Sequence, residues 1–246
     1  MNFPGCQLPL LADPSLITLA EDAGIYYTIH LADDFTASSF NPLVREAYLQ
    51  TLKGAIEVAK TFLPLRDRFG DPTQPLVINM RLTRGPYVTL PKKRVYLQEE
   101  DRLNYLDIMR EFAEKVTGWI GDADLRVAVE NTVGYTPLQQ EVLEEVLTYP
   151  AFALTWDIGQ SAVHGETDLN FLQKHRDRLL HFHIHDARKD PAACHLALGG
   201  GDGSLDLRER LFLAGECHAR CVLETKTAAS ISQSIRWLSM RDLWEF

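Results

Sequence analysis

Three histidines alternate with apolar residues in the stretch Leu179–Asp186, which reads Leu-Leu-His-Phe-His-Ile-His-Asp. In a β-strand successive side chains point to opposite faces, so His181, His183 and His185 would share one face. Imidazoles buried together are costly unless something binds them, and imidazole is a common ligand for divalent metals. A strand with a solvated histidine face is the alternative. The apolar surroundings favour the metal site.

Polar side chains also lie at or near the carboxyl ends of the other strands that the sequence predicts. These strands cover residues 25–31, 75–80, 125–130, 152–157 and 221–224, and the polar residues are His30, Asn79, Glu130, Asp157 and Glu224. Taken singly, each carboxylate could equally be a helix cap, a loop anchor or half of an ion pair. At the mouth of an α/β barrel such strand ends converge, and three carboxylates with a histidine would repel one another without a cation. This donor set, rich in oxygen, suits one divalent metal ion, Mn²⁺, Mg²⁺ or Zn²⁺.

Predicted helices alternate with these strands along the chain. They cover approximately residues 14–22, 42–62, 97–119, 136–148, 167–177, 205–216 and 228–238, and a long loop is expected at 81–95. Alternation of this kind is typical of parallel βαβ units. Because no linker or repeat interrupts the pattern, we expect one domain over residues 1–246. An α/β barrel needs about 250 residues, which fits this length.

The composition of the chain limits the kinds of partner that the protein is expected to bind. The net charge of −9 argues against nucleic acid, because binding phosphates needs an excess of Lys and Arg. No run of apolar residues is long enough to span a membrane, and Met1–Leu11 lacks the pattern of a secretory signal. The four cysteines form no C-x-x-C pair and are expected to be reduced thiols. We therefore expect a cytoplasmic protein that acts on a small-molecule substrate, without nucleic-acid or membrane partners.

Several short motifs together resemble the xylose isomerase-like TIM barrel superfamily, which includes the sugar phosphate isomerases/epimerases and the type 2 AP endonucleases. The motifs are Glu130-Asn131, Trp156-Asp157-Ile158-Gly159, His183-Ile184-His185-Asp186, the segment 195–201 and Glu224-Thr225-Lys226. Their order and spacing match together over roughly residues 30–238. The resemblance implies an α/β fold, a (β/α)8 TIM barrel of parallel strands with a metal at its carboxyl-terminal mouth.

The resemblance also implies roles for individual residues. The metal ligands would be Glu130, Asp157, His183 and Glu224. Glu130 and Glu224 would in addition be catalytic, each moving the substrate proton on one face of a sugar, while the metal stabilises an enediolate. The residues expected to contact the substrate are His30, His185, Arg188 (or Lys189), His195 and Lys226.

The chain departs from the AP endonuclease pattern at three places. It has Asn79 and Gln160 where those enzymes carry histidines, and Ala193-Cys194-His195 where they carry Asp-x-His. A three-zinc cluster is therefore not expected, and neither is DNA repair. The resemblance also implies that Gln160 weakens a substrate contact of the isomerases.

The amino terminus is short for this fold. Only 29 residues precede His30, whereas two βα units need nearly twice as many. We expect the first βα unit to be shortened or missing, which would expose two strand edges and an apolar seam. A homodimer could cover that seam.

Three functions fit these observations. The first is a metal-dependent isomerase or epimerase acting on a sugar or sugar phosphate. The second is a metal-dependent hydrolase of a small-molecule phosphodiester, which would use metal-bound water and would be favoured by a second ion. The third is a non-catalytic, degenerate barrel that only binds a metal or ligand.

Overall fold

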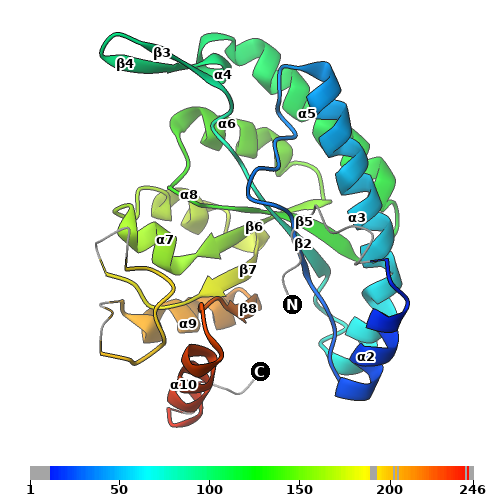
Figure 1. The fold of residues 1–246 in the computed structure, drawn as a ribbon, viewed down its shortest axis with the longest axis vertical. Coiled ribbons are helices and arrows are strands. Elements are labelled where there is room, and N and C mark those ends of the chain that lie inside the picture. The colour runs from blue at the N-terminus through cyan, green and yellow to red at the C-terminus, as the bar shows by residue number, and fades with distance from the viewer. Residues whose placement is uncertain (1–11, 189–192, 202, 204, 242, 244–246) are drawn as a thin grey trace. The chain divides into compact units, whose positions relative to one another are not determined.

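The computed structural model describes residues 12–188, 193–201, 203, 205–241 and 243, and Figure 1 shows its helices and strands. The chain forms two compact units. Unit 1 comprises Met1–Val129 and Thr136–Ala153, and unit 2 comprises Glu130–Tyr135 and Leu154–Phe246. The expectation of a single domain over residues 1–246 stays a prediction.

Unit 1 contains the first parallel strands. These are β1 (Ile29–His30), β2 (Leu76–Arg81) and β5 (Leu125–Glu130), whose last residue belongs to unit 2. β1 pairs with β2 in parallel, and His30 lies opposite Asn79. The helices of this unit are α2 (Ser15–Ala23), α3 (Pro42–Phe69), α4 (Leu97–Glu100), α5 (Arg102–Ile120) and α6 (Pro137–Val146). Strands β2 and β5 are almost wholly buried, as expected of parallel strands covered by helices.

Helix α3 shows how the sequence encodes these elements. Asn41 caps it, because its side chain accepts a hydrogen bond from the Leu43 backbone N–H at 3.1 Å. Pro42 fills the first helical position, where no N–H is needed. Apolar residues at helical spacing, including Leu52 and Ile56, are fully buried.

The prediction of a long loop at 81–95 is wrong for the second half of this segment. The structure has an antiparallel hairpin there, β3 (Tyr87–Leu90) and β4 (Lys93–Tyr96), which extends away from the helices of unit 1 (Figure 1). Its side chains are largely exposed, so the alternation of apolar and polar residues that signals a half-buried strand is missing. Cross-strand contact of Tyr87 with Tyr96 holds the hairpin instead, with ring centroids 5.4 Å apart.

The single helix expected at 97–119 is divided in two. α4 ends at Glu100 and α5 begins at Arg102, because Asp101 leaves the helical conformation with φ −122° and ψ 62°. The remaining helix boundaries in unit 1 agree with the sequence to within about two residues, except that α3 extends to Phe69.

Unit 2 contains β7 (Leu179–Ile184), β8 (Arg220–Leu223) and most of β6 (Phe152–Asp157), whose first two residues belong to unit 1. They are parallel, each paired with the next in the chain. The helices are α7 (Ile158–Val163), α8 (Leu169–Lys174), the short 3-10 helix η2 (Arg176–Arg178), α9 (Leu207–Glu216) and α10 (Ala228–Ser239). α7 was not predicted, because it is a six-residue helix that contains a glycine.

These strands and helices confirm the fold class, an α/β fold with parallel strands. The described residues contain six parallel strands, and only α2 and β1 precede α3. The strand considered for Met1–Leu11 lies outside the described residues. In the described part of the chain, no helix combines the length and the apolarity that crossing a membrane requires.

Candidate metal centre

Three carboxylate side chains of unit 2, which end or follow strands, surround His183. Its Nδ1 atom lies 3.1 Å from Glu224 Oε2, 3.7 Å from Glu130 Oε2 and 4.0 Å from Asp157 Oδ2. Glu130, Asp157 and His183 are buried, and the Glu224 side chain is 22% exposed. The structure thus brings together the four residues expected to be metal ligands.

The register of the strands and one amide side chain position Asp157. In the β6–β7 pairing Asp157 lies opposite His183. Asn131, which follows β5, accepts a hydrogen bond from the Asp157 backbone N–H at 2.7 Å and donates one to the Asp157 carbonyl at 3.4 Å. Asn131 is fully buried, and its part in holding Asp157 was not predicted, because the sequence alone does not show which backbone groups a side chain contacts.

The neighbouring carboxylates favour the protonated form of His183. Burial alone would lower its pKa, but hydrogen bonds with Glu130 and Glu224 outweigh burial and raise the pKa of His183 to about 10. Burial opposes the charge on Glu224 as well, yet the hydrogen bond with His183 lowers the pKa of Glu224 to about 2. In the absence of a metal, a proton on His183 therefore offsets part of the negative charge of the site.

The donor set fits a divalent cation. Asp157 Oδ2 is a buried oxygen without a hydrogen-bond partner among the described residues. Glu130, Asp157 and His183 offer ligand atoms within 4.8 Å of one another. A buried carboxylate oxygen without a partner is costly, and a cation removes that cost.

The other expected site residues lie in different environments. His195 is half-buried on the loop after β7, and its Nδ1 is 3.0 Å from the Glu224 backbone carbonyl. Burial, and then the nearby His185, lower the pKa of His195. Arg188 and Lys226 are exposed, and Lys189 lies outside the described residues. His30 is buried at the end of β1 in unit 1.

Among the described residues, Cys194, Cys217 and Cys221 form no disulfide with one another. Cys194 Sγ lies 3.7 Å from the side-chain nitrogen of Gln160. The expected anion cradle or turn at 199–201 begins with Gly199, whose φ is +64°. A Cβ at this position would lie 1.6 Å from the Trp237 ring, so Gly199 allows the loop to pack against α10.

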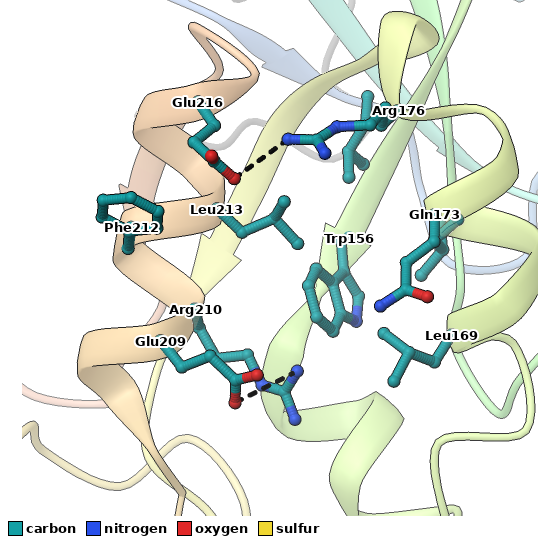
Figure 2. A pocket seen from close by; sticks show the side chains of 11 residues that line it. Trp156, Leu169, Gln173, Arg176, Glu209, Arg210, Phe212, Leu213 and Glu216 are labelled. Atoms are coloured by element: carbon teal, nitrogen blue, oxygen red, sulfur yellow. Dashed lines mark hydrogen bonds and ion pairs between the residues drawn. The ribbon is translucent and has the colours of Figure 1, made fainter.

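A pocket of about 410 Å³ lies on the opposite face of β6 from Asp157, between α8 and α9 (Figure 2). Trp156 forms part of its lining, and the Arg210 guanidinium lies 4.9 Å from the Trp156 ring centroid. An ion pair between Arg176 and Glu216, 3.0 Å apart, borders the pocket. None of the residues around His183 lines this pocket, so it is separate from the metal centre.

Comparison with solved structures identifies the type of fold. The chain resembles xylose isomerase-like TIM barrel proteins across most of its length, at sequence identities that show the fold alone. A D-tagatose 3-epimerase-like protein matches with a TM-score of 0.67 at 20% identity, over 94% of this chain and 83% of its own. The 3-keto-D-glucoside 4-epimerase YcjR from E. coli matches with a TM-score of 0.64 at 15% identity, over 96% and 87% of the two chains.

The same fold also occurs in a probable 3-DHS dehydratase, AsbF from Bacillus anthracis. It matches with a TM-score of 0.61 at 14% identity, over 97% of this chain and 86% of its own. No protein-family model and no curated protein matches the sequence.

Proposed function

We propose that the protein is a metal-dependent isomerase or epimerase acting on a sugar or sugar phosphate. The observation that carries this proposal is the set of three carboxylates around the buried imidazole of His183. The structural similarity to sugar epimerases supports the choice of substrate class.

In this proposal one divalent ion, Mn²⁺, Mg²⁺ or Zn²⁺, would be held by Glu130, Asp157, His183 and Glu224. When bound, it would supply electrostatic stabilisation of the negative charge that develops on two neighbouring substrate oxygens. Glu130 ends β5 and Glu224 follows β8, and a side-chain oxygen of each lies within 3.7 Å of His183 Nδ1. One carboxylate would take the proton from the sugar carbon and the other would return a proton on the opposite face.

Some of the remaining expected residues can serve the substrate. His195 lies beside Glu224, and its Nδ1 is within hydrogen-bond distance of a backbone carbonyl, which leaves Nε2 to accept a hydrogen bond from a sugar hydroxyl. The exposed side chains of Arg188 and Lys226 are suited to a substrate phosphate. His30 remains a predicted substrate contact.

The experiment is metal analysis followed by a substrate panel. We expect about one metal ion per chain by inductively coupled plasma mass spectrometry. With Mn²⁺ added, free and phosphorylated ketoses in deuterated water should incorporate deuterium at one carbon beside the carbonyl, detected by NMR. Glu130→Gln and Glu224→Gln should each abolish this exchange. Glu209→Gln, which changes an exposed glutamate of the same unit, should leave it intact.

Failure of exchange for every sugar, in a protein that carries its metal, would exclude the isomerase. A phosphodiester hydrolase is the second candidate, because His185, His195 and Glu224 form a further group of possible ligands. Two metal ions per chain would favour it. The hydrogen bonds of His185 favour a single ion, because both of its ring nitrogens contact protein groups.

A further inference from the structure

We propose that His185 is a positioning residue, which holds one oxygen of Asp157 so that only the other oxygen is presented to the metal. The inference rests on the proposed metal-dependent function and gives His185 a different role from the substrate contact that the sequence predicts. It is drawn from the hydrogen bonds of Asp157 and from the space that Gly159 leaves open.

The two carboxylate oxygens of Asp157 have different partners. Oδ1 accepts a hydrogen bond from the Gln160 backbone N–H at 2.7 Å and lies 2.9 Å from His185 Nε2. Oδ2 has no hydrogen-bond partner among the described residues and lies on the side of His183. Asp157 is therefore arranged to bind a metal through one oxygen.

The hydrogen bond to Asp157 places a proton on one nitrogen of His185. The Asp157 carboxylate can only accept, so His185 Nε2, 2.9 Å from Oδ1, is the donor. The other ring nitrogen, Nδ1, lies 2.9 Å from the backbone N–H of His195 and 3.2 Å from the Asp186 carbonyl. The ring is fully buried, so water does not compete for the bond to Asp157. A metal ligand hydrogen-bonded in this way keeps a fixed orientation.

Gly159 makes the approach of the ring possible. A Cβ at residue 159 would lie 1.9 Å from Cε1 of His185 and 2.3 Å from its Nδ1. Any larger residue would displace the ring from Asp157. Gly159 lies within α7 and does not have a positive φ. Glycine is therefore needed here for the close contact with His185 and not for an unusual backbone conformation.

The loop after β7 completes the arrangement. His195 donates its backbone N–H to His185, while its ring contacts the Glu224 carbonyl, and the rings of His185 and His195 lie 4.3 Å apart. His195 has φ +56°, an uncommon conformation for a residue with a side chain. The loop thereby links the orientation of Asp157 to the segment after β8 that contains Glu224.

The test measures metal affinity and the Co²⁺ absorption spectrum in variants of the full chain. His185→Ala and His185→Asn should weaken Mn²⁺ binding about 10- to 100-fold. They should also change the Co²⁺ spectrum, because Asp157 would no longer be fixed. His185→Gln should retain most of the affinity, since its side-chain amide nitrogen can replace Nε2, whereas that of Asn replaces Nδ1. Circular dichroism of the metal-free proteins shows whether each variant folds.

Gly159→Ala provides an independent test, because it leaves every polar group in place. It should weaken Mn²⁺ binding as His185→Ala does. Added to His185→Ala, it should have little further effect, since the methyl group then occupies the space of the missing ring. Gly215→Ala, in α9 of the same unit, is the matched control, because a Cβ there has no atom within 4 Å.

The outcomes separate this inference from the proposed function. If the natural protein binds Mn²⁺ and His185→Ala binds it within about twofold as tightly, the positioning role is wrong while the metal site stands. Equal losses in His185→Gln and His185→Ala would also overturn it, because the hydrogen bond would not be what matters. If the natural protein binds no divalent metal, the proposed function fails first, and this inference fails with it.

Discussion

His183 occupies an environment that is unfavourable for a neutral imidazole and favourable for a cation. Three carboxylates lie within 4.0 Å of its Nδ1, and two of them are fully buried. Buried carboxylates demand a compensating positive charge, which a proton on His183 provides in part and a divalent metal provides more fully. The site therefore depends on buried carboxylates whose negative charges would be unfavourable without a neighbouring cation.

Asp157→Asn tests the metal site with little disturbance of the fold. Asn keeps an oxygen that can cap α7 through the Gln160 N–H but loses the negative charge. We expect Mn²⁺ affinity, measured by isothermal titration calorimetry, to fall by at least about 10-fold. Asp206→Asn is the control, because Asp206 caps α9 in the same way, with a hydrogen bond from Glu209 N at 3.0 Å. Equal affinity in the two variants would show that Asp157 is not a ligand.

The stability of the metal-free protein should depend on pH in a defined direction. His183 has a raised pKa, near 10, so its contribution is complete below its ordinary pKa of about 6.5 and is lost as the pH rises through 10. Glu224 has a lowered pKa, near 2, so its contribution is complete above its ordinary value of about 4.5 and is lost as the pH falls through 2. Both contributions to the stability are therefore complete between about pH 4.5 and 6.5.

Urea unfolding of the metal-free protein checks this dependence. The free energy of unfolding should be greater at pH 6 than at pH 9.5, by about 1 kcal/mol or more. In His183→Gln this difference should shrink, because the group responsible is gone. An unchanged difference in the variant would assign the pH dependence to other residues.

At the scale of the element, short polar contacts decide where helices begin. Thr136 caps α6 by accepting a hydrogen bond from the Gln139 N–H at 3.2 Å, and the Gln139 side chain accepts one from the Thr136 N–H at 2.9 Å. The Gln139 amide also donates to the Leu82 carbonyl at 2.7 Å. This capping box fixes the start of α6 and joins it to the chain that follows β2.

Thr136→Ala should reduce the free energy of unfolding by about 1 kcal/mol, because an N–H at the start of α6 loses its partner. Thr51→Ala is the comparison, since Thr51 is partly exposed within α3 and its hydroxyl donates to the Ala47 carbonyl. Alanine has the higher helix propensity, so that change should be neutral or slightly stabilising. Urea unfolding midpoints of the two variants measure the contrast, and a smaller loss for Thr136→Ala than for Thr51→Ala would contradict it.

At the scale of the whole molecule, the residues around His183 link three strands of unit 2. Asp157 ends β6, His183 lies within β7 and Glu224 follows β8, while Glu130 ends β5. A ligand that joins these strand ends binds the folded protein and not the unfolded chain. Binding should therefore stabilise the fold by mass action.

Thermal unfolding should consequently respond to metal. At a free Mn²⁺ concentration 100 times the dissociation constant, the stabilisation should be about 2.7 kcal/mol, seen as a higher midpoint in calorimetry. A chelator should reverse the shift, and Asp157→Asn should show little of it. A shift of equal size in Asp157→Asn would place the stabilising metal elsewhere.

Much of the fold was predictable because local signals are strong in this sequence. Strands β5 and β6 have the predicted bounds, and α2 ends before Gly24 as expected. The hairpin β3–β4 and helix α7 were missed for physical reasons. The hairpin has no buried face to impose a period, and α7 is too short to show one.

The sequence by itself determined which groups can do chemistry: carboxylates and a histidine at the ends of successive strands, in an α/β pattern. These follow from residue type and from periodicity, which are properties of neighbours along the chain. Only the tertiary structure decided that Glu130, Asp157 and Glu224 approach one imidazole, and that His185 contacts Asp157 across the space left by Gly159. Distances between residues far apart in sequence depend on strand register and packing, which no local pattern specifies.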